Sequence, residues 1–481
     1  MSKPAPFLPG FASFRFARVP RLALEKLTPF SGFENIFTLF GKLVSPHCFK
    51  RESSGVNSRT RTLTPRMTFW AFIAQVLTPD VSCREIMGQL EALWRKNDPA
   101  CAATVSDSAY CQARVRLEQE SLKQISQGVI AHLEQRVPHQ QDYFEGRAIK
   151  IVDGTNLSMP DEPSLQALWP QSNNCLPGCG FPLLKMVGLF SLSSGALLSQ
   201  AQGNQHSSEG SLLKTLRVDL FSGDILLGDR AFCSYASLGE LKALGVDTVS
   251  RLSPKFGTMR PGKILGHGDQ LFRYVKPSKR SALCTLAEWK ALPDELEVRI
   301  IEVVVCAPGF RTQHLRLITT LCDAQAYPAE EIRALYGKRW NVEGHFNQLK
   351  TFLGLNVLRC KSPEMIKKEL QIHLIAYNLI RCLMQDCALT QGVALNRISF
   401  KGTLDTLRHW APLIDQAASP RQQAKLRSEL IEKMSQDLLP VREGRSEPRA
   451  RKRKPKQYPK MYGPRRTNKI NTQPEKRHFR P

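Results

Sequence analysis

The spacing of apolar residues changes along the chain, and the change separates a helical part from an α/β part. Between residues 67 and 145, apolar residues recur three or four positions apart, and Ser or Asp precedes several of these stretches. This pattern is typical of short, capped helices. From residue 148 onward, three short β-rich runs (148–153, 224–229 and 247–252) alternate with helical stretches. Such alternation predicts an α/β domain.

The second half of the chain continues this domain. Residues 186–200 predict a β-hairpin around a Ser-Ser-Gly turn, and residues 253–326 hold three further strand candidates separated by Gly, Pro and Lys. We expect the latter to form a β-rich subdomain inserted in the α/β domain. Long helices are expected at 329–354, directly after Pro328, and at 366–386, which is strongly apolar.

These patterns predict five parts of the chain. They are a loosely ordered N-terminal segment (1–66), a small helical domain (67–145), an α/β core (146–400) with its β-rich insertion (253–326), a C-terminal helical segment (401–440) and a basic disordered tail (441–481).

The amino-acid composition adds one feature that the hydrophobic pattern does not show, a large excess of basic residues. The 481 residues include 68 Lys and Arg against 43 Asp and Glu, a net charge of +25, while 42% hydrophobic residues suffice for a sizeable core. Residues 441–481 hold about half of the excess positive charge. So basic a chain indicates a polyanionic partner, namely DNA, RNA or an anionic membrane surface. We expect the tail to follow phosphates as a disordered arm, the alternative being a tail that only increases solubility.

Membrane, secretion and zinc signals are missing from the sequence. No run of 18 apolar residues occurs, and no basic region followed by an apolar run opens the chain, so we expect a cytoplasmic protein. The 13 cysteines include no CxxC pair, which disfavours a zinc site and predicts reduced thiols.

Candidate chemistry begins with two aspartates that end strand patterns. Asp153 follows an apolar run in Ile-Val-Asp-Gly-Thr, and Asp229 follows one in Leu-Leu-Gly-Asp-Arg. Folds of the α/β class place ligands at the carboxyl ends of strands. Taken singly, each could instead be an Asp that caps a turn or the next helix.

A third carboxylate lies on the expected helix 329–354. Glu343 shares a polar stripe with Tyr336, Arg339 and Lys350, centred roughly 70° from the apolar stripe at ~100° per residue. The stripe therefore borders the buried face. The alternative is an ordinary exposed face with an Arg339–Glu343 ion pair.

Three carboxylates that converge on one point would repel one another unless one is protonated or cations bind. Oxygen ligands suit hard divalent cations, magnesium above all. Two such ions can activate an attacking oxygen and stabilise the leaving oxygen at a phosphodiester.

The helix stripe resembles a known family signature. Its spacing matches the Y-(2)-R-(3)-E-(6)-K signature of bacterial insertion-sequence DDE transposases of the IS-four family, at Tyr336, Arg339, Glu343 and Lys350. The Asp-Gly-Thr at Asp153 and the Gly-Asp-Arg-Ala-Phe around Asp229 resemble the two upstream aspartate regions of that family. Residues 105–114 resemble its N-terminal helical region, and the resemblance spans residues 70–460.

The resemblance implies a ribonuclease H-like core, with a β-strand insertion between the second Asp and the Glu. It also implies a catalytic and metal-binding triad of Asp153, Asp229 and Glu343, which binds two Mg²⁺ ions that Mn²⁺ can replace. DNA phosphates near the transposon end would contact Tyr336, Arg339 and Lys350, and a flipped base would contact Trp340 or Trp289.

The same resemblance implies the partners. The helical domain would recognise terminal inverted repeats, and a homodimer would hold two ends of double-stranded DNA. The enzyme would cleave the element ends and join them to target DNA. It would be associated with the nucleoid through its DNA and would not bind a membrane.

Other functions stay open on the sequence alone. They are a catalytically inactive DNA-binding protein derived from a transposase, a two-metal nuclease on the same fold, and a basic structural protein. The triad, which is intact, disfavours the first, the basic stripe disfavours the second, and the size of the core disfavours the third.

Overall fold

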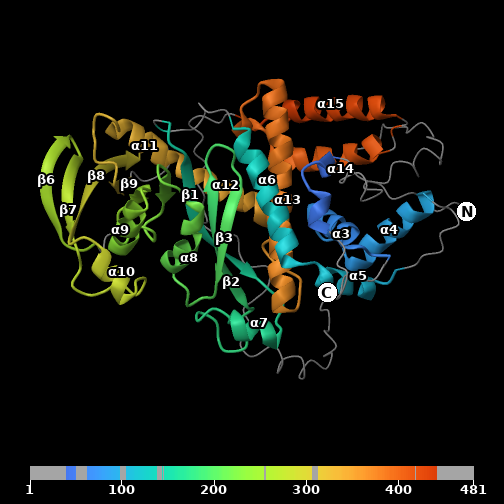
Figure 1. Ribbon diagram of the computed structural model, residues 1–481, viewed down its shortest axis with the longest axis horizontal. Coiled ribbons are helices and arrows are strands. Elements are labelled where there is room, and N and C mark those ends of the chain that lie inside the picture. Colours follow the sequence, from blue (N-terminus) through green and yellow to red (C-terminus); the bar gives the residue numbers. More distant parts are fainter. Residues whose placement is uncertain are drawn as a thin grey trace, which may run out of the picture.

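In the computed structural model, a mixed sheet runs from one end of the molecule to its middle, with helices on both of its faces (Figure 1). The structure describes residues 39–49, 62–97, 105–137, 144, 146–253, 256–305, 313–415, 417 and 419–440. The expected basic tail and most of residues 1–66 lie outside the described residues.

Within the described residues, four helices precede the sheet, and further helices lie between its strands and after them. The helices are α3 (Pro65–Leu77), α4 (Cys83–Asn97), α5 (Asp107–Arg116), α6 (Gln119–Gln135), α7 (Pro163–Leu168), α8 (Glu209–Leu216), α9 (Tyr235–Ala243), α10 (Leu286–Ala291), α11 (Ala329–Gly337), α12 (Asn341–Asn347), α13 (Pro363–Gln391), α14 (Phe400–Asp415) and α15 (Pro420–Gln436). Short turns of helix are η2 (Pro46–Phe49), η3 (Arg217–Asp219), η4 (Lys338–Trp340), η5 (Gln348–Phe352) and η6 (Leu395–Arg397). The strands are β1 (Ile149–Ser158), β2 (Leu183–Ser191), β3 (Leu197–Gly203), β4 (Ile225–Gly228), β5 (Asp247–Arg251), β6 (Met259–Gly266), β7 (Asp269–Val275), β8 (Glu295–Val305) and β9 (Gln313–Thr319).

The nine strands form one sheet in the order β3-β2-β1-β4-β5-β9-β8-β7-β6. Strands β1, β4 and β5 are parallel neighbours, and the other neighbouring pairs are antiparallel. The pairing of β1 with β4 ends at Ile151 and Leu227, although β1 continues to Ser158. Beyond these residues the two strands no longer hydrogen-bond, so a crevice opens at their carboxyl ends.

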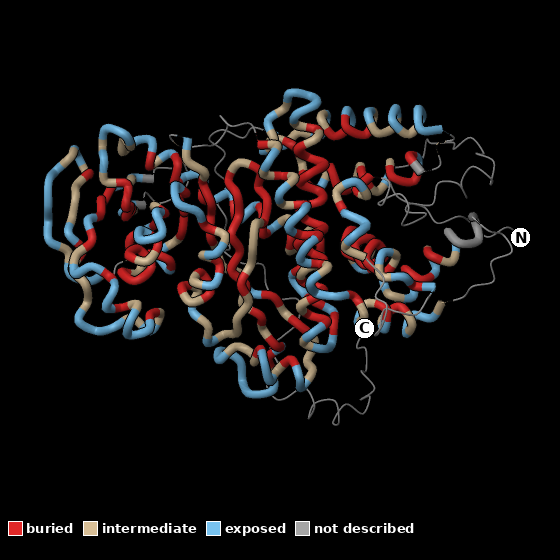
Figure 2. Tube along the Cα trace, viewed as in Figure 1, coloured by how far each residue is buried: buried red, intermediate tan, exposed pale blue. Residues whose placement is uncertain are grey.

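Each face of the central strands buries its own apolar side chains. Alternate residues of a strand point to opposite faces. Ile151 of β1 accordingly lies in the core that contains α13, whereas Val152 packs with Leu212 and Leu213 of α8. The buried residues follow the central strands and α13 in Figure 2.

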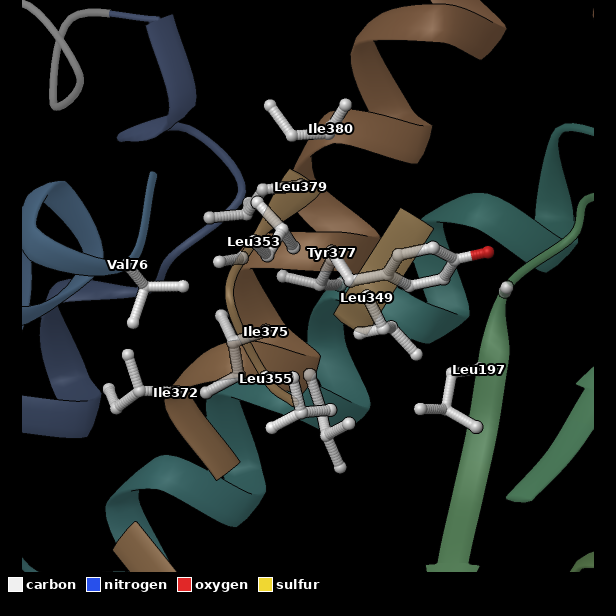
Figure 3. Close-up of a cluster of buried hydrophobic side chains, with 14 of the residues drawn as sticks. Val76, Leu197, Leu349, Leu353, Leu355, Ile372, Ile375, Tyr377, Leu379 and Ile380 are labelled. Atoms are coloured by element: carbon white, nitrogen blue, oxygen red, sulfur yellow. The ribbon is translucent and has the colours of Figure 1, made fainter. Parts of the chain in front are cut away.

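The long helix α13 is the main buried support of the molecule. Its residues pack with α3, with the segment around Leu353 and with Leu197 of β3, as Figure 3 shows. Helix α6 lies along α13 as well (Figure 1). Helices α3 and α6, from the N-terminal helical part, are therefore packed on the same core as the sheet.

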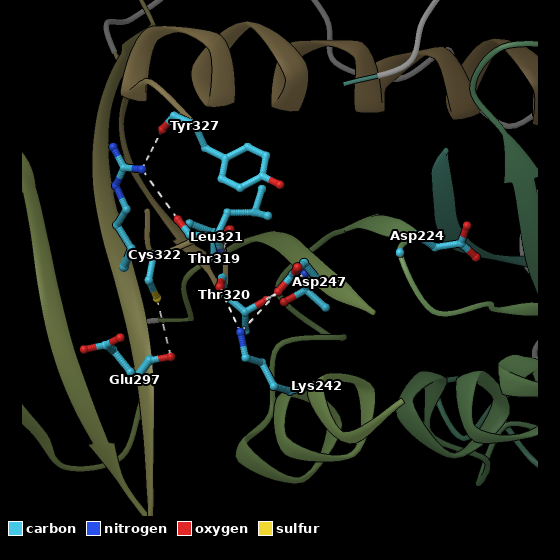
Figure 4. A network of polar contacts seen from close by, with 12 residues as sticks. Asp224, Lys242, Asp247, Glu297, Thr319, Thr320, Leu321, Cys322 and Tyr327 are labelled. Carbon is cyan, nitrogen blue, oxygen red and sulfur yellow. Dashed lines mark hydrogen bonds and ion pairs between the residues drawn. The ribbon is translucent and has the colours of Figure 1, made fainter. Parts of the chain in front are cut away.

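The strands that follow β5 extend the central sheet through a polar junction (Figure 4). Thr320 accepts a hydrogen bond from the backbone N–H of Thr248 (3.0 Å) and donates one to Asp247 (2.6 Å). The buried guanidinium of Arg299 donates to the carbonyl of Tyr327 (2.7 Å) and pairs with Asp269 (2.6 Å). Strands β6–β9 are thus tied to the central strands and do not form a separate sheet.

Most expected elements are present, and one expectation needs correction. The expected uninterrupted helix 329–354 is instead a succession of α11, the 3-10 turn η4, α12 and the π-helical turn η5. Gly337 and Gly344 have the lowest helix propensity apart from proline, and π turns insert an extra residue into the helical repeat. The sequence also missed β6, whose Arg-Pro-Gly-Lys run is that of an exposed edge strand.

No helix within the described residues is both long enough and apolar enough to cross a membrane.

Candidate active site

Two aspartates stand at the crevice between β1 and β4. Asp153 lies on β1 just past the last residue paired with β4, and its Oδ1 accepts a hydrogen bond from the N–H of Gly154 (2.8 Å). Asp229 directly follows β4, and its Oδ1 accepts from the N–H of Ala231 (2.7 Å). The backbone therefore fixes one oxygen of each carboxylate.

Glu343 reaches the same region from helix α12. It is exposed, and it lines a cavity of about 670 Å³ together with Asp153, Thr155, Asn347 and Lys350. The cavity lies between β1 and α12, so carboxylates from a strand and a helix more than 180 residues apart in sequence face one space.

Asp153 is partly buried and has both negative and positive neighbours. Burial raises the pKa of its carboxyl, and the neighbouring charges of Asp229 and Glu343 raise this pKa further. The hydrogen bond from Gly154 and the charge of Arg339 act in the opposite direction. The Arg339 guanidinium lies 3.6 Å from Asp153 Oδ2.

Arg339 and its aromatic neighbours form the wall beside Asp153. Arg339 is only 7% exposed, and its guanidinium lies over the rings of Trp340 (4.9 Å) and Tyr336 (5.7 Å). Its Nε is buried and has no hydrogen-bond partner in the described part of the chain. Burial raises the pKa of Tyr336, whereas the adjacent Arg339 lowers it.

Lys350 lies at the far end of the stripe. Its ammonium donates hydrogen bonds to Thr155 Oγ1 (2.9 Å) and to the carbonyl of Asn156 (3.2 Å). Both acceptors are neutral, and burial lowers the pKa of Lys350. Because these contacts bring no opposite charge, Lys350 can still pair with an anion.

The structure separates the two tryptophan candidates. Trp340 is 57% exposed and stands next to Arg339, whereas Trp289 is 8% exposed. Trp289 packs against Tyr235 in a second hydrophobic core, and the Lys276 amine lies 5.6 Å from its ring. The Trp289 ring thus fills the contact of α10 with α9 and is not exposed for stacking on a base in this structure, whereas the ring of Trp340 is exposed.

The sequence missed one acidic neighbour of the aspartates. Glu209 begins α8, and a Cβ added to Gly154 would overlap its carboxylate, with the Cδ 3.0 Å away. Burial raises the pKa of Glu209, and the charges of Asp229 and Asp153 raise it further. In sequence, Glu209 shows only as the first residue of a helix, and the glycine next to Asp153 was the available signal.

The donor set is suited to a hard divalent cation. All of the acidic groups around the crevice supply oxygen ligands, and the mutual repulsion of buried carboxylates is relieved when a cation binds. In the described part of the chain, no three Asp, Glu, His or Cys side chains are close enough together to form a metal centre as they stand.

Comparison with known proteins finds family matches for the α/β core and for the helical region that precedes it. Residues 144–379 match the family described as transposase DDE domain, and residues 46–126 match insertion element 4 transposase N-terminal. The chain is 27% identical over 452 residues to transposase InsG for insertion sequence element IS4 of Escherichia coli (strain K12), covering 91% of this chain and 97% of that protein. It is 38% identical over 72 residues to the transposase for insertion sequence element IS421 of Escherichia coli, covering 15% and 19% of the two chains. A solved structure of the piggyBac transposase synaptic complex with hairpin DNA aligns at 11% identity over 87% of this chain and 86% of that chain, with a TM-score of 0.38.

Proposed function

The chain belongs to the DDE transposases of the insertion-sequence IS4 family, and from this membership we propose how its residues cut and join DNA. The enzyme is a DNA transposase. We propose that it binds the terminal inverted repeats of an insertion sequence, hydrolyses the DNA at the element ends and joins the freed 3′-hydroxyls to target DNA.

The core that carries this chemistry is proposed to be ribonuclease H-like. The order β3-β2-β1-β4-β5 supports this assignment, with three antiparallel strands followed by two parallel neighbours. In this arrangement the carboxyl ends of β1 and β4 lie side by side and carry the two aspartates. Strands β6–β9 are proposed to be the family's insertion, since they lie between Asp229 and Glu343 in sequence.

Asp153, Asp229 and Glu343 are proposed to hold the divalent metal ions on which this family depends. We propose Mg²⁺, with Mn²⁺ as a substitute, because the donors are carboxylates alone. When bound, two such ions supply Lewis-acid stabilisation of the attacking and leaving oxygens at phosphorus. The protein's own part is to fix one oxygen of Asp153 and one of Asp229 by backbone N–H groups.

Arg339 and Lys350 are proposed to bind DNA phosphates on either side of the cleaved bond. The buried, unpartnered Nε of Arg339 leaves a donor free beside Asp153. Lys350 has two neutral acceptors, so a phosphate can supply the missing negative charge. Tyr336 supports the guanidinium through its ring, and the exposed Trp340 is placed to stack on an unpaired base.

Assembly is also a proposal. The helical part from α3 to α6 is proposed to read the inverted repeat, and two copies of the chain are proposed to hold two ends. The packing of α3 and α6 on α13 supports a fixed geometry between the DNA-reading helices and the cavity. The mass of the complex with an end duplex, by light scattering, tests the dimer, and a single chain on paired ends would contradict it.

The observation that carries this function is the convergence of Asp153 and Glu343 on one cavity beside Arg339. The test is a cleavage assay on a duplex with the flanking inverted repeat, in Mg²⁺ and in EDTA. We expect nicking at the repeat boundary in Mg²⁺ alone, and none by Asp153→Ala. Binding of the end without nicking, in Mg²⁺ or in Mn²⁺, would instead support a catalytically inactive DNA-binding protein.

A further inference from the structure

The crevice at Asp153 has a fourth acidic side chain, which reaches it from the opposite face of the sheet. Val152 of β1 packs on α8, and Gly154 points to the same face because strand residues alternate. Glu209, the first residue of α8, rests its carboxylate where the side chain of Gly154 would be. Since β4 leaves β1 after Ile151, that position borders the crevice that holds Asp153 and Asp229.

The position of Glu209 is fixed by its neighbours. Ser208 caps α8, with its hydroxyl accepting from the N–H of Ser211 (3.1 Å), so the helix needs no cap from Glu209. The preceding loop is held by Lys185, whose ammonium donates to the carbonyl of Ser207 (2.6 Å). Within the described residues no hydrogen bond or ion pair is found for the Glu209 carboxylate, and its favourable charged neighbour is the Lys185 ammonium, which is also bonded to Ser207.

An ordinary glutamate in a first helical turn is stabilised by the helix dipole and faces water. Glu209 instead is half-buried. Burial, followed by the charges of Asp229 and Asp153, raises the pKa of its carboxyl, and the charge of Lys185 opposes this rise only in part. A cation bound beside Glu209 and the two aspartates would relieve the repulsion among their carboxylates. Gly154 makes this approach possible, because any side chain there would push the carboxylate away.

We propose that Glu209 helps to hold the divalent cation of this active site together with Asp153 and Asp229. This inference rests on the proposed function, which places the cation at these carboxylates. Residue Gly154 has a positioning role, since it leaves the space that the Glu209 carboxylate occupies.

Direct binding of Mn²⁺ to the full chain without DNA tests the inference, with free Mn²⁺ followed by electron paramagnetic resonance. We expect Glu209→Gln, which keeps the shape and removes the charge, to weaken Mn²⁺ binding at least ~10-fold. The matched control is Glu364→Gln, which removes an exposed glutamate from the first turn of α13 and should bind like wild type. Wild-type affinity in Glu209→Gln, or an equal loss in both variants, would overturn the inference.

A second variant makes the test independent of how Glu209→Gln folds. Gly154→Ala should displace the flexible end of Glu209 without breaking β1, so it should weaken Mn²⁺ binding to the same extent. The double variant should then bind no more weakly than Glu209→Gln alone. Wild-type affinity in Gly154→Ala, or additive losses in the double variant, would contradict the arrangement.

Asp153→Asn separates this inference from the proposed function. If Asp153→Asn loses Mn²⁺ binding and Glu209→Gln does not, the proposed site stands and only the role of Glu209 is wrong. If Asp153→Asn also binds Mn²⁺ like wild type, the metal site itself is wrong.

Discussion

At the scale of single residues, Asp153 combines burial with negative neighbours. Its carboxyl has a raised pKa in the folded chain, chiefly through burial. A carboxyl whose pKa is raised on folding binds protons more readily folded than unfolded, so stability falls as pH rises through that pKa. The active-site charge is therefore a cost to the folded state at neutral pH.

Asp153→Asn should be more stable than wild type at pH 7 to 8 in EDTA, because it removes the buried charge. The advantage should shrink as the pH falls through the raised pKa of the Asp153 carboxyl, because the wild-type side chain then becomes protonated. Thermal unfolding of the wild type and of Asp153→Asn across this pH range measures the difference in Tm. A pH-independent difference in Tm would mean that the raised pKa is not its source.

Glu343→Gln should still bind an end duplex but lose strand cleavage, because the amide keeps the shape and loses the charge. We expect a loss of at least ~100-fold, as is typical when an electrostatic catalytic group is removed. The measurement compares binding by gel shift with nicking in Mg²⁺, and wild-type nicking would exclude Glu343 from the triad.

Lys350→Ala should weaken binding to any DNA sequence and reduce the slope of log affinity against log salt by ~0.9, the share of one phosphate. Lys425→Ala is the control, because Lys425 is an exposed lysine on α15 that pairs with Glu429. Equal slopes for Lys350→Ala and the control would show that Lys350 contacts no phosphate.

At the scale of elements, α12 is joined to α13 by a buried hydrogen bond. Tyr377 of α13 donates to the carbonyl of Gly195 (2.8 Å), and its hydroxyl lies 3.0 Å from Nδ1 of His345 on α12. Burial lowers the pKa of His345 to about 3, so its ring is neutral. Because the Tyr377 hydroxyl gives its single proton to Gly195, we assign the donor role in the second contact to the Nδ1–H of His345. Since His345 is two residues from Glu343, this bond holds the helix that presents the third carboxylate.

Tyr377→Phe should lower the free energy of unfolding by ~1–3 kcal/mol, because it leaves a buried imidazole N–H and a carbonyl without their partner. Urea denaturation measures the change. Tyr327→Phe, whose hydroxyl accepts from the guanidinium of Arg147 near the surface, serves as the control. Equal losses in the free energy of unfolding for the two variants would mean that the buried hydrogen bond stabilises the fold no more than the surface one.

At the scale of the whole molecule, a group of acids stands inside a strongly basic chain. The net charge is +25, and about half of the excess lies in residues 441–481, outside the described part. A field of this sign attracts DNA over distances set by salt. Under the proposed function, the basic segments would serve DNA binding and the acidic crevice would serve the chemistry.

Removal of residues 441–481 should weaken DNA binding and flatten its salt dependence, since 15 basic residues are lost with only 3 acidic ones. Affinities for one duplex at several salt concentrations measure the slope. An unchanged slope would mean that the tail contacts no phosphates and that the body alone binds DNA.

The sequence by itself determined the elements and part of the site. Local periodicity depends on which side chains are buried, so β4 and the β2–β3 hairpin were predictable to within a few residues. The existence of β1 and α13 was predictable too, but each of them continues about five residues beyond its predicted end. The family resemblance around Glu343 then singled out three carboxylates as the expected catalytic triad. The sequence did not show that η4 and η5 interrupt the predicted helix 329–354, because such turns depend on packing.

Only the tertiary structure decided which side chains meet. The order of strands in the sheet places Asp153 beside Asp229, and the end of the β1–β4 pairing opens the crevice between them. The same packing buries Trp289 in another core and brings Glu209 against Gly154. The physical reason is that a sequence pattern gives the buried face of each element, whereas contacts across the sheet depend on strand order, register and the absence of one side chain.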